Sequence, residues 1–380
     1  MKRKGLRHGY TTGACAAAAA RGAVLMLRDQ RLVDEVEIIL PGGDAARFRI
    51  HGQSFTLNSA HCYVLKDAGD DPDVTHGAEI HAEAELVDAR GRNAIVIRGG
   101  HGIGRVTKPG LAAKVGEAAI NPVPLRMITT AVIEVLSLNC PVFGECCSPV
   151  IPQITVSIPN GEELAKKTLN ARLGIVGGLS ILGTTGIVKP VSSQAWTDTI
   201  DASIDVALAC KCSTLVLSTG RTSEMAAQRF FSAPLPGASR GCSMNGMDRL
   251  PDEAYIMMGD YVGHTLRACR QKRVEKVILS AQFAKLLKIA CGHEHTHASS
   301  SRLDLRNLAA WLVGSPHASR LSSLIMGAAT AREIFQSAGD DPVLLSLVRD
   351  RAALFAAGIA PGLGIQVFLA GYSGEMVYFR

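Results

Sequence analysis

The segment EIHAEAELV, residues Glu79–Val87, decides the interpretation of the first half of the chain. Apolar residues alternate along it with glutamate and histidine, so one face of an extended chain is apolar and the other is polar. This period of two predicts a half-exposed strand of an antiparallel sheet. The segments Glu35–Leu40, Ala46–Ile50 and Ala94–Ile97, each bounded by Gly, Pro or Asp, predict further strands of the same kind.

Outward from these strands, the pattern changes at about Gly161. The short apolar runs Thr214–Leu217, Glu253–Met258 and Val274–Leu279 alternate with helical patterns, which is typical of parallel βαβ units. We therefore expect a mixed α+β and α/β fold. A largely antiparallel N-terminal domain would cover residues 1–160, and a mostly parallel α/β domain would cover residues 161–380.

Composition excludes several classes of protein. Hydrophobic residues make up 47% of the 380 residues and charged residues 19%, which excludes a disordered chain or a coiled coil. The net charge of +6 comes without a basic stripe, so we expect no nucleic-acid binding. The uncharged segment Ala352–Gly374 is interrupted by Gly and Pro, so no membrane span is expected. Ten scattered cysteines indicate reduced thiols and a soluble, cytoplasmic protein.

Two glycine-rich segments could bind a ligand. Gly174–Val188 has five glycines, three hydroxyl side chains and no charge, and such a loop lets a ligand approach the backbone closely. The alternative is a pair of tight turns around a buried strand. Gly99–Gly104 is a second cluster whose spacing does not match a dinucleotide-binding motif. It could equally be a ligand-facing turn or a connector.

The segment Lys66–Gly77 concentrates ionisable side chains on one turn. Candidates for acid–base chemistry are Asp67, Asp70, Asp71, Asp73 and His76, because crowded charges shift one another's pKa values. We rank Asp71 and His76 first. The alternative is a solvated turn, or a turn that only positions substrate.

A protein-bound metal is not expected. His293, His295 and His297 alternate and could share a face of an extended segment, but no fourth ligand is recognisable. Cys146-Cys147 and Cys210-Lys211-Cys212 are too closely spaced for a zinc pair.

Several segments resemble, in the same order along the chain, the motifs of one protein family. The segments that carry the resemblance are Gly9–Ala19, Lys66–Gly77, Gly102–Leu111, Ile120–Pro124, Asn170–Pro190, Gly259-Asp260, Lys285–Ala290 and Thr296-His297. They resemble the motifs of the CbiD family, the cobalt-precorrin-5B C1-methyltransferases of cobalamin biosynthesis. The resemblance implies transfer of a methyl group from S-adenosylmethionine to carbon 1 of a cobalt tetrapyrrole, with any cobalt arriving inside the substrate.

The residues that we assign to this reaction fall into three groups. The catalytic candidates are Asp71, His76 and Asp67; the candidates for binding S-adenosylmethionine are Gly177, Gly178, Gly183, Thr184, Thr185 and Gly186; the candidates for binding substrate are Thr11, Thr12, Gly13, Gly102, Gly104, Lys108 and His297. The sequence leaves open which glycine-rich segment holds which ligand, and whether the chain forms a homodimer. A non-catalytic tetrapyrrole or metal carrier and a phosphate-ligand enzyme are the alternatives.

Overall fold

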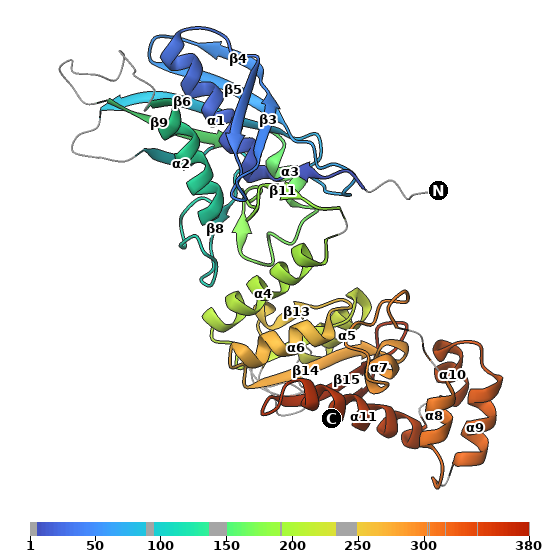
Figure 1. Ribbon diagram of the computed structural model, residues 1–380. Coiled ribbons are helices and arrows are strands. Elements are labelled where there is room, and N and C mark those ends of the chain that lie inside the picture. The colour runs from blue at the N-terminus through green and yellow to red at the C-terminus, as the bar shows by residue number, and fades with distance from the viewer. Residues whose placement is uncertain are drawn as a thin grey trace, which may run out of the picture. The chain divides into compact units, whose positions relative to one another are not determined.

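The computed structural model describes residues 6–88, 95–136, 150–190, 192–232, 249–301, 303, 305–315, 317–339 and 341–379. The chain divides into two compact units, Met1–Ser193 and Gln194–Arg380 (Figure 1). No helix in these ranges is both long enough and apolar enough to cross a membrane.

The first unit is built on a five-stranded sheet in the order β4-β5-β6-β9-β7. Its neighbouring strands are antiparallel except for β7 and β9, which run parallel. The elements are β1 (Gly9–Tyr10), α1 (Thr12–Asp29), β2 (Glu35–Ile39), β3 (Ala45–Arg49), β4 (His51–Phe55), β5 (Ser59–Leu65), β6 (Glu79–Asp88), β7 (Val96–Gly99), β8 (Arg105–Val106), α2 (Pro122–Leu136), β9 (Val150–Ser157), α3 (Gly161–Ala165), β10 (Ile175–Val176) and β11 (Ile187–Val188).

Helix α1 is the centre of the first unit's core. Its residues Ala14–Ala20 are fully buried, and small side chains let the helix lie close to its neighbours. It packs on β5, β6 and α2, and the inward-facing residues of β6, Ile80, Ala82 and Ala84, are also fully buried. The apolar face that the period of two gives β6 therefore packs against α1.

Residues 161–193, which the sequence analysis assigned to the second domain, lie in the first unit. The reason is strand pairing, since β10 pairs with β8 and β11 pairs with β1. The turns between these strands also make isolated bridges, Ile103 to Leu179 and Ile120 to Ile181.

The second unit contains a five-stranded sheet in the order β13-β12-β14-β15-β16. The first four strands are parallel, and β16 is antiparallel to β15. The elements are α4 (Ser193–Ala209), β12 (Thr214–Ser218), α5 (Arg221–Ser232), a 3₁₀ turn (Asp252–Ala254), β13 (Tyr255–Met257), α6 (Val262–Gln271), β14 (Lys276–Gln282), α7 (Phe283–Ala290), α8 (Leu305–Trp311), α9 (Ala318–Gly327), α10 (Ala331–Ala338), α11 (Pro342–Ile359), β15 (Gly364–Ala370) and β16 (Met376–Phe379).

Helices cover both faces of this sheet (Figure 1). Val216 and Ile278 pack with residues of α5 on one face, while Leu217 and Leu279 pack with residues of α6, α7 and α11 on the other. Strand β12 has β13 on one side and β14 on the other, so the chain reverses its direction across the sheet at β12. In open α/β sheets, ligands bind at the carboxyl ends of the strands beside such a reversal.

The expected mixed fold class, with antiparallel and then parallel sheets, is confirmed. The apolar periodicity of Leu321–Phe335 predicts a single helix, but the structure has the pair α9 and α10 there. The break occurs because the Thr330 hydroxyl accepts the Glu333 N–H (3.1 Å) and starts a new helix. The segment Phe231–Arg249 is rich in Pro, Gly, Ser and Met, which predicts a long loop. It lies mostly outside the described residues, and its first two residues close α5.

Candidate functional site

The acidic loop between β5 and β6, residues 66–77, packs against the N-terminal strand β1. The Tyr10 N–H donates to the carbonyl oxygen of Asp67 (2.7 Å). A Cβ atom on Gly9 would lie 2.0 Å from the carbonyl carbon of Ala68, so only glycine permits this approach. Two motifs that are far apart in sequence are thus in direct contact.

Asp67 is held as an anion by Arg7. The guanidinium donates from Nη2 to Oδ1 (2.9 Å) and from Nη1 to Oδ2, and the Gly69 N–H also donates to Oδ1 (2.9 Å). The hydrogen bond from Arg7 lowers the pKa of Asp67 below its usual range, although burial opposes the shift. A carboxylate with a lowered pKa is a weak base at neutral pH. This geometry favours an anchoring role for Asp67 over proton transfer.

Lys66 and Asp73 form a buried ion pair within the loop. The Lys66 side chain is 1% exposed, and its Nζ donates to Asp73 Oδ2 (2.7 Å). Asp73 Oδ1 accepts the N–H (2.8 Å) and the hydroxyl (2.6 Å) of Thr75. Burial acts to raise the pKa of Asp73, but Lys66 and Thr75 outweigh it, so the pKa lies below its usual range. The pair therefore stabilises the conformation of the loop.

The two highest-ranked catalytic candidates, Asp71 and His76, lie in one turn built on Ala68. The Ala68 N–H donates to His76 Nδ1 (3.1 Å), and the Asp71 N–H donates to the Ala68 carbonyl oxygen (3.4 Å). Because Nδ1 accepts, a neutral His76 ring carries its proton on Nε2. In this arrangement the Nε2–H of the half-exposed imidazole is available to donate a hydrogen bond.

The N-terminus of α1 contacts the glycine-rich segment 174–188. The Leu182 N–H donates to Thr12 Oγ1 (3.0 Å), the Gly13 N–H donates to the Leu182 carbonyl oxygen (3.1 Å), and the Thr11 N–H donates to the Gly186 carbonyl oxygen (3.0 Å). Thr11 also caps the helix through its hydroxyl. Both threonines are buried, so in this structure their polar atoms serve the protein's own chain.

Three glycines of the two glycine-rich segments allow one backbone to cross another. A Cβ atom on Gly178 would lie 2.2 Å from the Gly102 carbonyl oxygen, and one on Gly104 would lie 2.8 Å from the Gly178 carbonyl oxygen. One on Gly102 would lie 1.9 Å from the carbonyl oxygen of Ile158. At these positions the structure supports the interpretation as tight turns around a strand.

Gly183 and Gly186 are restricted in a different way. Both have positive φ angles, 120° and 80°, which L side chains rarely adopt. A Cβ atom on Gly183 would lie 2.5 Å from the Thr11 side chain, and one on Gly186 would lie 2.7 Å from Leu40. Side chains introduced here would disturb packing, so loss of activity in such variants would not identify ligand contacts.

Other positions near these glycines remain open to a ligand. Gly177 has a φ of 80°, and a Cβ atom there would meet nothing within 4 Å. Thr184 and Thr185 are exposed, and the Thr185 hydroxyl accepts the Ile187 N–H (3.2 Å). Lys108 is half-buried because its stem packs over Gly174, where a Cβ atom would lie 2.4 Å from Lys108 Cγ.

The acidic loop, the start of α1 and the glycine-rich segment therefore meet around β1, whose Gly9 is paired with Val188 of β11. Behind them lies Cys15, fully buried, where burial raises the thiol pKa to about 12. Cys15 is thus a neutral packing residue and not a nucleophile.

A second polar cluster lies in the second unit, after β13 and on α7. Thr296, fully buried, donates from Oγ1 to Asp260 Oδ1 (2.6 Å), which also accepts from Lys285 Nζ. Lys288 Nζ donates to the Thr296 carbonyl oxygen (2.9 Å). Burial acts to raise the pKa of Asp260, but Lys285 and Thr296 outweigh it and lower it. Burial, with the charge of Lys285, lowers the pKa of Lys288.

His297 stands next to this cluster. It is exposed, and its Nδ1 lies 2.8 Å from the Ser299 hydroxyl oxygen and accepts the Ser299 N–H (3.3 Å). It belongs to the second unit, whereas the other assigned residues belong to the first.

Sequence analysis did not foresee an aromatic surface beside this cluster. Trp196 of α4 is 41% exposed, and its Nε1–H donates to the Met258 carbonyl oxygen (3.4 Å). It stacks with Tyr261 at a ring separation of 6.5 Å, and a Cβ atom on Gly259 would lie 3.3 Å from the indole. Such a face can stack on a flat ligand. A single tryptophan in a helical pattern carries no signal of this role, and the Gly259-Asp260 motif was the available cue.

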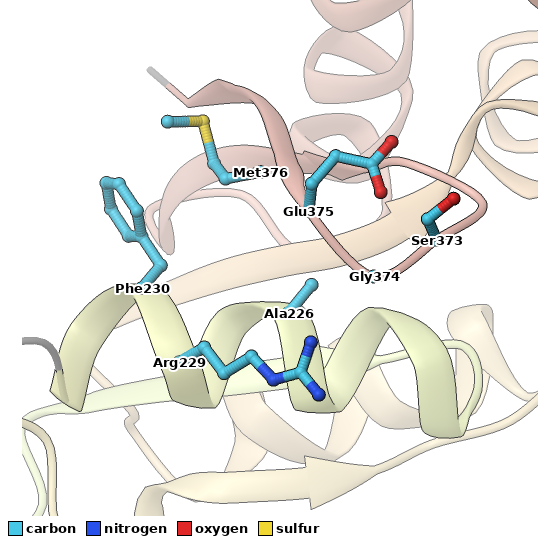
Figure 2. Close-up of a pocket in the computed structure, with 7 residues that line it drawn as sticks. All are labelled: Ala226, Arg229, Phe230, Ser373, Gly374, Glu375 and Met376. Carbon is cyan, nitrogen blue, oxygen red and sulfur yellow. The ribbon is translucent and has the colours of Figure 1, made fainter.

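Open hollows occur elsewhere in the second unit. One, of about 390 Å³, lies between α5 and the turn that joins β15 to β16, with Arg229, Phe230, Glu375 and Met376 among its lining residues (Figure 2). None of the residues assigned from the sequence lines it. Within the described ranges, no group of three His, Cys, Asp or Glu side chains could hold a metal ion.

Comparison with known proteins defines the family. The CbiD family matches residues 1–190. Cobalt-precorrin-5B C(1)-methyltransferases from Geobacter sulfurreducens and Geobacter metallireducens are 59% and 56% identical, each over 100% of both chains. The protein of that name from Priestia megaterium is 42% identical over 87% of this chain and 83% of its own. The chain belongs to the CbiD family.

The chain is also similar to a protein of solved structure. It is the cobalamin biosynthesis protein CbiD from Archaeoglobus fulgidus, which is 27% identical. The match covers 75% of this chain and 79% of that one, with a TM-score of 0.37.

Proposed function

We propose that this chain methylates carbon 1 of cobalt-precorrin-5B, with S-adenosylmethionine as the methyl donor. The observation that carries the proposal is 59% identity, over 100% of both chains, to a relative that bears this name. The ordered motifs that carry the resemblance lie in both units, so the relationship is not confined to one of them.

The proposed reaction is a displacement at a methyl carbon. When bound, S-adenosylmethionine supplies an electrophilic methyl group on its sulfonium sulfur. Carbon 1 provides the electron pair for the new bond, the carbon–sulfur bond breaks with its electrons remaining on sulfur, and the macrocycle loses one proton. S-adenosylhomocysteine is the second product. Alignment of the two reactants and exclusion of water are then the main tasks of the protein.

The proposed contacts in the first unit follow from what remains open there. Gly177, Thr184 and Thr185 have space beside them and suit the methyl donor. His76 would donate a hydrogen bond. Asp71 is the proposed base, as ranked from the sequence, while Asp67 and Asp73 pair with Arg7 and Lys66 and would hold the loop in place. The other assigned positions, Gly102, Gly104, Gly178 and Thr11 among them, would act by fixing the backbone that carries these groups.

The remaining proposals concern the net charge, the cellular location and the oligomeric state of the protein. The macrocycle carries several carboxylates, so the net charge of +6 would favour its approach. Described cysteines Cys15, Cys62, Cys212 and Cys269 are buried free thiols, which supports the proposed cytoplasmic location. A homodimer is proposed as the protein's oligomeric state.

Turnover with labelled donor tests this function. Purified protein is incubated with methyl-labelled S-adenosylmethionine and cobalt-precorrin-5B, with heat-denatured protein as the control. We expect label in the corrinoid fraction in proportion to active protein. Tight corrinoid binding without transfer of label would instead support the carrier alternative.

A further inference from the structure

The turn between β12 and α5 contains a buried hydroxyl without a partner. Ser218, the last residue of β12, is fully buried, and its Oγ has no hydrogen-bond partner in the described protein. Buried polar groups almost always have a partner, so this one requires an explanation.

The position of this hydroxyl follows from strand register. Ser218 is paired with Ser280 of β14, and both are fully buried. Val216 and Ile278, two residues earlier, pack with α5, so alternation places both serine side chains on that face. The Ser280 hydroxyl donates to the carbonyl oxygen of Ser223 in the first turn of α5 (2.9 Å). Ser218 therefore points toward the same turn, but its hydroxyl makes no hydrogen bond there.

The start of α5 offers donors at this place. The backbone N–H groups of Gly220, Arg221, Thr222 and Ser223 have no acceptor in the described part of the chain, whereas the Glu224 N–H donates to the Gly220 carbonyl oxygen (3.0 Å). A Cβ atom on Gly220 would meet nothing within 4 Å. The first turn of a twelve-residue helix, with open space beside it, suits an anionic group.

The location agrees with the topology. The turn follows β12, the strand at which the chain reverses its direction across the sheet, and the Gly259 N–H donates to the Ser218 carbonyl oxygen (3.2 Å). The Trp196 indole lies against Gly259, so the turn is next to the aromatic surface formed by Trp196 and Tyr261. A ligand with a flat ring and an acidic group could use both.

We propose that the Ser218–Ser223 turn binds a carboxylate of a ligand, through these N–H groups and the Ser218 hydroxyl. The proposal rests on the proposed function, because both reactants there carry carboxylates and neither carries a phosphate. Glu224, buried in the same turn, lies 3.8 Å from Arg221 Nη1, which offsets its charge. The subsite would therefore bind the carboxylate through hydrogen bonds and the helix dipole, with modest affinity.

The test uses variants of the full chain and calorimetric binding. Ser218→Ala removes the unpartnered hydroxyl, and Gly220→Val fills space that is open in the protein. Ser280→Ala is the matched control, because it removes a buried hydroxyl at the same register that already has its partner. Circular dichroism confirms that each variant is folded before binding is measured.

The probes separate the two sources of the carboxylate. S-adenosylhomocysteine is compared with 5′-methylthioadenosine, which lacks the amino-acid carboxylate, and cobyrinic acid is compared with its heptamethyl ester. We expect Ser218→Ala and Gly220→Val to weaken binding of one of the two acids by about tenfold, the effect of one hydrogen bond to a charged group. The carboxylate-free analogue and the Ser280→Ala variant should bind as the wild type does.

Three results would overturn the inference. They are wild-type affinity for both acids in Ser218→Ala and Gly220→Val, equal weakening of the acid and its carboxylate-free analogue, and no binding of either acid by the wild type. Failure of the proposed function is recognised separately, as no transfer of label by the wild-type protein.

Discussion

Breaking the Lys66–Asp73 pair should destabilise the first unit strongly. Lys66 is 1% exposed and Asp73 is 24% exposed, with 2.7 Å between Nζ and Oδ2. Removing one partner of a buried pair costs about 3–5 kcal/mol, because the other charge is left uncompensated. Asp73→Asn leaves the fully buried ammonium alone and should fall in this range. Lys66→Met should cost about 3 kcal/mol, since Asp73 keeps its two bonds from Thr75.

The double variant Lys66→Met with Asp73→Asn measures the coupling energy between the two side chains. With both charges removed, the combined loss should be smaller than the sum of the single losses by about 2 kcal/mol. Urea unfolding should be monitored by hydrogen exchange of peptides from the first unit. Tryptophan fluorescence does not report on that unit, because both tryptophans, Trp196 and Trp311, lie in the second unit. Additive single effects, or faster exchange confined to β12–β14 peptides, would refute this account of the pair.

The remaining predictions concern pH, the glycine-rich segment and the second cluster. The pKa of Asp73 is lowered in the folded state, so its stabilisation is present above the usual Asp pKa of about 3.9 and is lost as pH falls through the folded value; acid titration monitored by circular dichroism should show a flatter loss for Lys66→Met. Gly177→Ala should lower the free energy of unfolding by about 1–2 kcal/mol because of the positive φ, and it should weaken S-adenosylhomocysteine binding measured by calorimetry. Gly183→Val should lower the melting temperature further, because the new side chain would clash with Thr11. Asp260→Asn should reduce stability by about 1–3 kcal/mol, because Lys285 and Thr296 lose a charged acceptor, and thermal melts against the exposed control Asp252→Asn measure this.

Local patterns in the sequence predicted much of the fold. The alternation in Glu79–Val87 was sufficient for β6, because one face of that strand is buried and the other is not. The apolar runs around Val216 and Ile278 were sufficient for the parallel sheet, since such strands are buried on both faces. Strand β9 was not foreseen, and Pro152 within it removes a ladder donor and weakens the signal.

The site was less accessible to sequence reasoning. A glycine-rich segment shows that the backbone needs freedom, but Gly178 and Gly177 look alike in sequence although only the first is crowded by Gly102. The ranking of His76 could not include its bond from Ala68, which depends on how the loop closes. Ser218 carried no signal at all, because its missing partner arises from the register of β12 against β14.

The most direct test of the central claim is the position of the transferred methyl group. Cobalt-precorrin-5B is incubated with the protein and S-adenosylmethionine labelled with carbon-13 in its methyl group, and the corrinoid product is examined by NMR spectroscopy and mass spectrometry. The account predicts one new labelled methyl group bonded to carbon 1, with one equivalent of S-adenosylhomocysteine formed. A labelled methyl group at any other carbon, or an unlabelled macrocycle recovered intact from folded protein, would contradict it.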